Sequence, residues 1–522
     1  MFLNLKKFLE KYSIYFIFAL IFATRLFFLG KAPAGINQDE AMAGYQALSM
    51  NAEGTDLFGY HNPVYFVAWG SGMSVLPSYI MRISFAFIDN KVVALRLPQA
   101  IMSCVALVTF YLLMKRFVPR KKAIVALILA AVMPWNFMSG RWAIDCYMLP
   151  VFMLLGTYFF VRGMDSGKWW IVSAICWGLS LYCYALSWMA VPGILLFYFL
   201  YGIKTGKIKC TKSTIRWGVP SIVILLLLAI PLILFLLVNY GIIPEIRLSW
   251  ISIPKLPGMR SSEISLKGLL SGTNLSAFLQ LLLTQNDKLI NNTTLFYGLF
   301  YHFSLVFIVL GIILVVKRTI TEFRKKEFIA EVLVLIPLVI YFVLALLVDN
   351  INANKINGML WPLTVCMIIG VFAVADKVGH CIGAAMIGLY LMFFLSFGIY
   401  YMTDYRELLQ AVNWYGLEDA VAFADELDVE HIYVAEDYSY AKVLFASEIS
   451  AKEYQETVVY EKYPAAWLKV KSFGRYVMEL DLDASPDENA AYIIGYDHVD
   501  IFENAGFEVE AFGYSLVAYM PE

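Results

Sequence analysis

Long apolar runs separated by short basic or polar segments fill the first four hundred residues of the chain. Two clear examples are residues 221–238 (SIVILLLLAIPLILFLLV) and 331–348 (EVLVLIPLVIYFVLALLV). A helix needs roughly 20 residues to cross the hydrocarbon layer of a membrane. Each run is close to that length, so the pattern predicts a helical protein that crosses the membrane many times.

Basic clusters between the runs predict the orientation of the spans. Lys and Arg concentrate in cytoplasmic loops, so we expect these clusters to lie inside the cell. An even number of crossings must separate the first two clusters, yet three apolar stretches lie there. The weakest stretch, residues 67–88, is interrupted by Gly, Ser, Pro and Arg, and we expect it to be an interfacial helix on the outer surface. The four clusters are Lys6/Lys7/Lys11 and residues 115–122, 204–216 and 317–326.

The other apolar stretches predict about eleven membrane-spanning helices within a domain covering residues 1–402. The N-terminus is then cytoplasmic, and loops 30–92 and 241–294 are extracytoplasmic. The first apolar run follows three lysines, as in a signal peptide, but its length favours an uncleaved anchor. The predicted spans are 14–29, 93–114, 123–138, 147–162, 169–186, 188–203, 217–240, 295–316, 328–348, 356–375 and 380–402.

The remaining residues, 403–522, show a different pattern, in which segments with helical spacing alternate with strand-like segments. This tail holds 25 acidic and 7 basic residues, whereas the preceding part holds 16 acidic and 33 basic residues. We therefore expect a soluble, acidic α/β domain outside the cytoplasm, in which no catalytic motif is evident. The predicted helices are 417–427 and 440–450, and the predicted strands are 431–435, 491–496 and 507–519.

Composition supports a membrane protein and argues against two kinds of stabilising site. Hydrophobic residues make up 60% of the 522 residues, charged residues make up 16%, and the mean hydropathy is +0.68. Soluble domains are nearer one half apolar and one quarter charged. All seven cysteines precede the tail without any CxxC pair, so a disulfide framework or a structural zinc site is not expected.

Candidate chemistry lies in the external loops. Asp39 and Glu40 are adjacent carboxylates just beyond the first span, and His61 follows in the same loop. A loop of this length is usually functional or disordered, and its aromatic content argues against disorder. The alternative is that the acidic pair only starts a helix. Arg141 and Asp145 lie four residues apart beyond a later span, where they could also simply pair with each other.

Together these segments resemble the multispanning glycosyltransferases of the GT-C type, which use polyprenyl-phosphate-linked sugars. This superfamily includes the protein O-mannosyltransferases and the bacterial transferases that add aminoarabinose to lipid A. The resemblance covers roughly residues 10–400 and leaves out the tail, and segments 291–301 and 352–362 carry it less specifically. The segments that carry it best are Asp39-Glu40, residues 94–98 (ALRLP), the basic turn 115–122, and Pro134, Ser139, Arg141 and Asp145.

The resemblance implies that Asp39 is the catalytic base. It would accept the proton of an acceptor hydroxyl, which attacks the anomeric carbon from the face opposite the carrier phosphate and inverts its configuration. A carboxylate suits this role if burial raises its pKa. Glu40 would position the acceptor or a divalent metal ion, although the sequence does not identify a cofactor.

The resemblance also implies a substrate-binding set. Arg141 and Lys355 are the candidates for stabilising the leaving phosphate, with Arg96 as a third. Members of the superfamily often carry Arg or His at the position of Lys355. His61 and Asp145 complete the predicted set. The expected partners are a polyprenyl-phosphate-linked sugar, membrane lipid and an acceptor glycan, lipid or protein, and no nucleic acid.

Two other classes of function compete with this interpretation. A transporter or flippase usually places ionisable residues near the middle of the bilayer and has paired halves with broken helices. Here the predicted spans are nearly free of Asp and Glu. A non-catalytic scaffold for the tail is the other alternative, and it gives no reason for Asp39, Arg141 and Lys355 to converge on one cavity.

Overall fold

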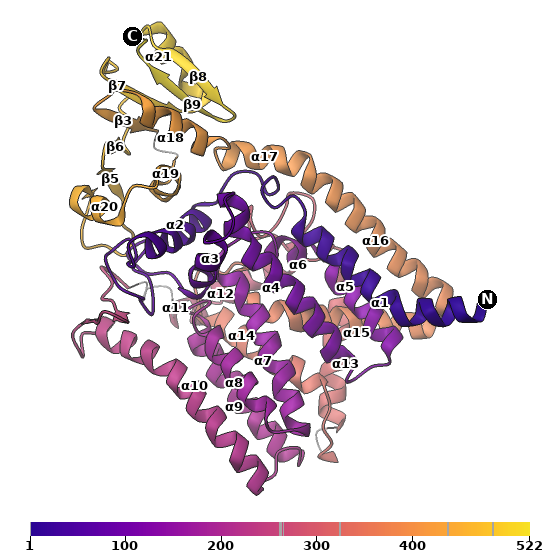
Figure 1. Ribbon diagram of the computed structural model, residues 1–522. Coiled ribbons are helices and arrows are strands. Elements are labelled where there is room, and N and C mark those ends of the chain that lie inside the picture. Colours follow the sequence, from indigo (N-terminus) through magenta and orange to yellow (C-terminus); the bar gives the residue numbers. More distant parts are fainter. Residues whose placement is uncertain are drawn as a thin grey trace.

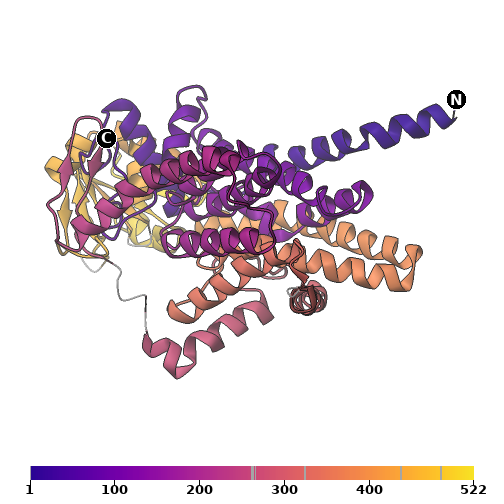
Figure 2. The same ribbon diagram turned by 90° about the horizontal axis from the view of Figure 1, so that it is seen from below.

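The computed structural model describes residues 2–259, 264, 266–322, 325–435, 438–482 and 485–521, with side chains from Tyr12 onward except that of Leu266. The side chains of Lys6, Lys7, Lys11 and Arg324, which belong to the predicted basic clusters, lie outside this description. Helices fill the first four hundred residues, and the sheet of the tail lies at one end of the helical bundle (Figure 1). The N-terminus lies at the opposite end (Figure 2).

The helices of the bundle follow the predicted spans closely. Among the described residues, seven helices are long and apolar enough to cross a membrane, and four shorter apolar helices accompany them. The chain is therefore a multi-pass membrane protein, while the count of eleven spans stays a prediction. The helices are α1 (Phe2–Leu26), α4 (Lys91–Met114), α5 (Arg120–Ala131), α6 (Pro134–Ser139), α7 (Met148–Asp165), α8 (Trp169–Ser180), α9 (Ser187–Lys204), α10 (Lys212–Asn239), α13 (Ser304–Glu322), α14 (Glu331–Leu347), α15 (Leu360–Val378) and α16 (His380–Met402).

One predicted span, residues 123–138, is divided between α5 and α6. Met133 is extended, with φ −72° and ψ 135°, and Pro134 occupies the first turn of α6. A proline disfavours the helical conformation of the residue before it, so the first helix ends and a second one begins. The chain then turns through the short 3-10 helix η1 (Asp145–Tyr147) into α7.

The first external loop contains two helices, α2 (Gln38–Ala52) and α3 (Leu76–Phe85). The prediction of a single helix over residues 67–88 is therefore wrong for its first nine residues. There the chain forms a tight turn closed by hydrogen bonds between Phe66 and Met73, with φ +100° at Gly70 and +94° at Gly72. Such backbone angles suit glycine and interrupt a helix.

The second external loop is also more ordered than its polar sequence suggests. It contains a short antiparallel pair, β1 (Ile246–Arg247) with β2 (Ser252–Ile253), and the helices α11 (Leu266–Ser271) and α12 (Thr273–Thr284). The predicted span 295–316 begins late, because residues up to Phe303 remain irregular and α13 starts at Ser304.

The tail is an α/β unit built on a seven-stranded mixed sheet, as the alternating pattern predicts. The strand order is β4-β5-β6-β3-β7-β9-β8, in which β3 is parallel to both neighbours and the other pairs are antiparallel. Helix α17 (Asp404–Val412) leads from α16 into it (Figure 1). The other elements are α18 (Leu417–Glu426), β3 (His431–Val434), α19 (Tyr440–Ser447), α20 (Ala451–Thr457), β4 (Val459–Tyr460), β5 (Val470–Phe473), β6 (Tyr476–Val477), β7 (Ala490–Ile494), η5 (Tyr496–His498), α21 (Val499–Asn504), β8 (Glu508–Phe512) and β9 (Ser515–Tyr519).

The tail and the first external loop share one hydrophobic core. Buried residues of α2, such as Met42, belong to the same cluster as Leu444 and Phe445 of α19. A Cβ atom on Gly44 would lie 2.6 Å from the Phe445 ring, so glycine permits α2 and α19 to approach closely. The hydroxyl of Tyr45 donates to the carbonyl of Ile449 at 2.5 Å. The tail is therefore packed on the membrane part rather than tethered to it.

This packing predicts that α2 and the tail lie on the same side of the membrane. In a Cys210→Ser/Cys381→Ser background, which removes the exposed cysteines, Ala52→Cys and Glu456→Cys should react with an impermeant thiol reagent on intact cells. Lys121→Cys, exposed at the start of α5, should react only after the cells are permeabilised. Labelling of Lys121→Cys in intact cells, with protection of the other two, would reverse the predicted orientation.

Candidate active site

The acidic pair lies in the first turn of α2. Asn37 caps this helix, because its side chain accepts a hydrogen bond from the backbone N–H of Asp39 at 2.9 Å. In return, the Glu40 carboxylate accepts from the backbone N–H of Asn37 at 3.2 Å, which completes a capping box. The acidic pair therefore does start a helix, which was the alternative to a chemical role. The cap also fixes the position of Asp39, which is half-buried.

Glu40 is fully buried in an ion pair with Arg96 of α4. Its two oxygens accept from Nε and Nη2 of Arg96 at 3.0 and 2.8 Å, and Oε1 also accepts from the backbone N–H of Ala143 at 2.7 Å. With the bond from Asn37, four donors occupy the carboxylate. All four donors belong to the protein, and the predicted contact of Glu40 with an acceptor or a metal ion stays a prediction.

Arg96 has no donor left over for a phosphate in this arrangement. Besides the two bonds to Glu40, its Nη atoms donate to the carbonyl oxygens of Leu29, Pro33 and Gly35 at 3.3, 2.6 and 2.6 Å. The side chain is fully buried, and its guanidinium lies 5.3 Å from the ring centre of Trp142. Arg96 therefore joins α4 to α2 and to the turn that follows α1, and its phosphate-binding role stays a prediction.

Arg141 has a similar role at the end of α1. Its Nη1 donates to the carbonyls of Thr24 and Arg25 at 2.9 and 3.2 Å, and its Nη2 donates to those of Phe27 and Ala32 at 2.9 and 2.6 Å. The last carbonyls of a helix have no partner within the helix. The Nη atoms of Arg141, which is 1% exposed, donate to the last of these carbonyls, while its buried Nε has no hydrogen-bond partner among the described residues. The phosphate-binding role of Arg141 stays a prediction.

Sequence reasoning missed Arg25, the third buried arginine of this region. It belongs to α1, and its Nη2 donates to the carbonyl of Ala131 and to Oδ1 of Asn136, the latter at 2.9 Å. Together with Arg141 it fixes α1 to the α5–α6 junction. The sequence did contain a signal for Arg25, namely a charged residue within an apolar run. Such a residue requires buried polar partners.

Asp145, in η1, lies within electrostatic range of Asp39. Its substrate-binding role stays a prediction. Its oxygens accept from the backbone N–H of Cys146 at 2.7 Å and of Ser74 at 3.4 Å. Burial and, to a smaller extent, the negative charge of Asp39 together raise the pKa of Asp145 to about 7, against the opposing effect of those hydrogen bonds. Two neighbouring carboxylates in which one titrates near neutrality are suited to proton transfer.

Lys355 lies in the segment between α14 and α15, which packs against η1. Its Nζ donates to the carbonyl of Asp349 at 2.8 Å, and the residue is 9% exposed. The contact with η1 comes from Asn357, whose amide donates to the carbonyl of Cys146 at 2.7 Å. The phosphate-binding role of Lys355 stays a prediction. Asn357, which the sequence analysis did not single out, has a buried Oδ1 without a hydrogen bond.

A polar cluster lies beside this segment. The hydroxyl of Tyr147 bonds to Asn291 and to Oδ1 of Asn292, and the amide of Asn292 donates to Oδ2 of Asp287 at 2.6 Å. That same oxygen accepts from the backbone N–H of Ala353. The less specific family segments, 291–301 and 352–362, therefore meet at the site.

His61 is separate from these residues. It is exposed, its Nδ1 lies 3.1 Å from the carbonyl oxygen of Gly54, and residue 61 pairs with Thr55 across a turn of the first external loop. This hydrogen bond does not involve the acidic pair, and the substrate-binding role of His61 stays a prediction. Among the described residues, no group of three or more His, Cys, Asp or Glu side chains is arranged to hold a metal ion.

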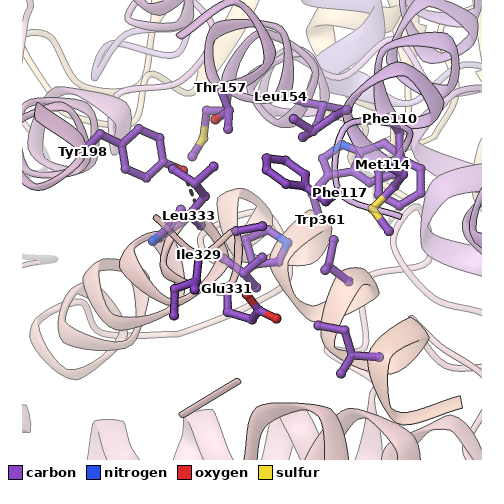
Figure 3. A pocket seen from close by; sticks show the side chains of 18 of the residues that line it. Phe110, Met114, Phe117, Leu154, Thr157, Tyr198, Ile329, Glu331, Leu333 and Trp361 are labelled. Atoms are coloured by element: carbon purple, nitrogen blue, oxygen red, sulfur yellow. Dashed lines mark hydrogen bonds between the residues drawn. The ribbon is translucent and has the colours of Figure 1, made fainter. Parts of the chain in front are cut away.

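An apolar cavity of about 290 Å³ extends between the membrane helices below η1. Figure 3 shows Phe110, Leu154, Tyr198 and Trp361 around it, with Glu331 at its edge. Pro150 of α7 and Gly358 line the end nearest the site, and Phe117 lines the far end. Its size and apolar wall suit a hydrocarbon chain.

Comparisons with known proteins agree with this architecture. Residues 73–236 match the family model of the dolichyl-phosphate-mannose-protein mannosyltransferases. A comparison with curated protein sequences finds no match. The family match spans less than half of the chain, so the evidence for a wider likeness is structural.

Three solved structures are similar to this one. ArnT from Cupriavidus metallidurans in the apo state has a TM-score of 0.56 and 12% identity, covering 98% of this chain and 99% of that chain. The same protein bound to undecaprenyl phosphate has a TM-score of 0.55 and 11% identity, covering 98% and 100%. The oligosaccharyltransferase AglB from Archaeoglobus fulgidus has a TM-score of 0.48 and 14% identity, covering 84% and 64%. The chain has the fold of ArnT over nearly its whole length, including the tail.

The raised pKa of Asp145 predicts how stability depends on pH. A carboxyl group with a raised folded-state pKa weakens the fold as pH rises from about 4 toward about 7, because its charged form is disfavoured only in the folded protein. Asp145→Asn removes this cost. We expect it to raise stability at pH 8 by on the order of 1–3 kcal/mol and to change it less at pH 5. Thermal unfolding in detergent at the two pH values measures the difference.

Asp89→Asn, in an exposed part of the first external loop, is the control and should leave the pH dependence unchanged. An equal effect of Asp145→Asn at pH 5 and pH 8 would contradict the assignment of the titration to Asp145.

Proposed function

We propose that this protein transfers a sugar from a polyprenyl phosphate to a hydroxyl group of an extracytoplasmic acceptor. The observation that carries the proposal is the placement of Asp39, which a capping box fixes at the start of α2 in electrostatic contact with Asp145. This pair lies within a fold shared with ArnT. ArnT binds undecaprenyl phosphate in one of its structures, which supports a lipid carrier of that kind here.

In the proposed reaction the acceptor hydroxyl oxygen attacks the anomeric carbon of the donor sugar. The bond between that carbon and the phosphate oxygen breaks, and its electron pair leaves with the phosphate. Asp39 accepts the hydroxyl proton as the new glycosidic bond forms, which gives inversion at the anomeric carbon. Asp145, which titrates near neutrality, can exchange a proton with Asp39 and restore it for the next turnover.

The leaving phosphate needs a nearby positive charge. The resemblance gives this role to Arg141 and Lys355. We favour Lys355, because its segment packs against η1 through Asn357, whereas both Nη atoms of Arg141 donate to backbone carbonyls. Asn357, two residues further, would add an amide beside η1.

The apolar cavity would hold the carrier chain. Its lining includes Pro150 and Gly358, which follow η1 and Asn357 closely in the chain, and residues of the membrane helices such as Leu154 and Trp361 (Figure 3). A lipid with its head group beside Lys355 can extend its chain along this wall. An amphiphilic donor of this kind accounts for the many spans around the site.

Asp39→Asn should abolish transfer while leaving the fold intact, because the amide keeps the shape of the side chain but cannot accept the proton. Loss of a general base typically costs about 10²–10⁴-fold in rate. The measurement is release of polyprenyl phosphate from a radiolabelled polyprenyl-phosphate sugar by the purified protein in nanodiscs. Asp89→Asn is the control and should retain full activity. Equal turnover by Asp39→Asn and the unmodified protein would remove Asp39 from the proposal.

Filling the cavity should weaken binding of a long-chain donor. Leu154→Trp adds volume to the cavity wall, and overpacking excludes part of the carrier chain. We expect KM for a long-chain donor to rise about tenfold, with a much smaller change for a donor carrying a short prenyl chain. Leu227→Trp, on the exposed face of α10, is the matched control. Equal effects on both chain lengths would argue against the cavity as the chain site.

A further inference from the structure

A second cavity lies between the first external loop and the tail, on the tail side of α2. It has a volume of about 340 Å³ and is more polar than the cavity among the membrane helices. Gln38, which directly precedes Asp39, lines it. The other lining residues are Trp69, Tyr438, Ser439, Tyr440, Glu461, Trp467, Leu468, Lys469, Val470, Lys471, Met478 and Glu479. We call it the loop–tail cleft.

Backbone pairing fixes one wall of the loop–tail cleft. The N–H of Leu468 donates to the carbonyl of Trp69 at 2.8 Å, and Gly70 forms a bridge with Trp467. Gly70 has φ +100°, and a Cβ atom there would lie 2.5 Å from the carbonyl oxygen of Ala465. The tight turn in residues 67–73, which the sequence pattern did not predict, therefore serves to dock the tail segment that carries Trp467.

Aromatic rings form a platform in this wall. The rings of Trp69 and Trp467 stack with centroids 5.2 Å apart at an interplanar angle of 12°, and Tyr440 meets Trp69 edge to face at 5.6 Å. Trp69 is 5% exposed, whereas Trp467 is 47% exposed. A buried ring thus supports an exposed one. A large exposed aromatic surface inside a polar cleft is unusual unless a ligand covers it.

The charged side chains of the cleft are balanced. Lys469 and Glu461 approach to 3.3 Å, and Lys471 and Glu479 approach to 3.6 Å. The described lining therefore carries two positive and two negative charges. These partly exposed pairs offer donors and acceptors to hydroxyl groups but give no net attraction for a phosphate or a carboxylate. The chemistry favours a neutral, hydroxyl-rich ligand.

We propose that the loop–tail cleft binds a neutral saccharide and that this saccharide is the acceptor. Sugar rings have an apolar C–H face that packs on an aromatic ring, while their hydroxyl groups bond to surrounding polar side chains, and the cleft provides both. Gln38 connects it in the chain to Asp39. The acceptor role rests on the proposed function, but saccharide binding does not, so the two can fail separately.

Saturation-transfer-difference NMR on the full-length protein in nanodiscs tests the binding. The probes are mannotetraose, chitotetraose and cellotetraose, with tetragalacturonate as an acidic comparison. We expect at least one neutral probe to receive saturation at its C–H protons and tetragalacturonate to receive less. Trp467→Ala should weaken that probe's affinity about tenfold, as truncation of a central aromatic contact does elsewhere. Trp467→Phe should retain most of it.

The control is Trp250→Ala, which removes a still more exposed tryptophan (68%) from the second external loop, outside the cleft. It should leave the signal unchanged. Trp467→Ala should fold, because the docking bonds at this position are made by backbone atoms. Absence of saturation with all three neutral probes, or a signal that Trp467→Ala does not alter, overturns the proposal, as does stronger binding of tetragalacturonate.

Comparison with the Asp39→Asn assay separates the two proposals. If saccharide binding depends on Trp467 but Asp39→Asn turns over the donor normally, the catalytic proposal fails and the cleft stands as a saccharide-binding site. If Asp39→Asn abolishes transfer but no neutral saccharide binds, the cleft proposal fails, and an acceptor of another class, such as a peptide, takes its place.

Discussion

The buried ion pair between Glu40 and Arg96 is the interaction on which the outer half of this protein depends. Burying a carboxylate and a guanidinium costs several kcal/mol per ion unless their remaining hydrogen-bonding positions are filled. Here the carboxylate accepts four hydrogen bonds, and the guanidinium donates to three carbonyls as well as to Glu40. Because Glu40 follows Asp39 directly, the pair that secures α2 to α4 also fixes the position of the proposed base.

The turn after α1 explains why arginines gather here. This turn and the end of α1 expose a series of backbone carbonyls in the protein interior, where water cannot satisfy them. Arg96 and Arg141 each supply a planar set of donors that reaches several carbonyls at once, which lysine could not do. An arginine near a family motif can therefore hold two parts of the fold together or bind a phosphate, depending on the acceptor that it contacts. Here the carbonyl acceptors lie more than sixty residues away in the chain.

Features that depend on interactions between neighbouring residues could be predicted from the sequence, whereas features that depend on contacts between distant segments could not. Most helices of the bundle and the tail strands β3, β7, β8 and β9 were predicted, because periodicity reports local burial. The early start of α1, the late start of α13 and the short strands β4, β5 and β6 were not predicted. The chain break at Pro134 and the turn at Gly70 depend on single residues inside apolar stretches, which a hydropathy pattern averages out. Asp39 and Asp145 were singled out from family motifs, and their roles stay predictions. The shared core of α2 and α19 joins segments four hundred residues apart, and no local pattern reports it.

The shared core changes what the tail can do under the proposed function. A tethered domain would present a ligand to the site at a variable distance, whereas α19 packed on α2 fixes the tail relative to Asp39. The two cavities lie in different surroundings. One lies among the membrane helices and includes Pro150, shortly after η1, and the other lies between the first external loop and the tail and includes Gln38, next to Asp39. A transferase needs to bring a lipid-borne donor and a hydrophilic acceptor to one carboxylate without placing either in the other's environment. Asp39, held at the junction of the membrane part and the tail, meets that requirement. The donor can reach it from the membrane, and the acceptor can reach it from water.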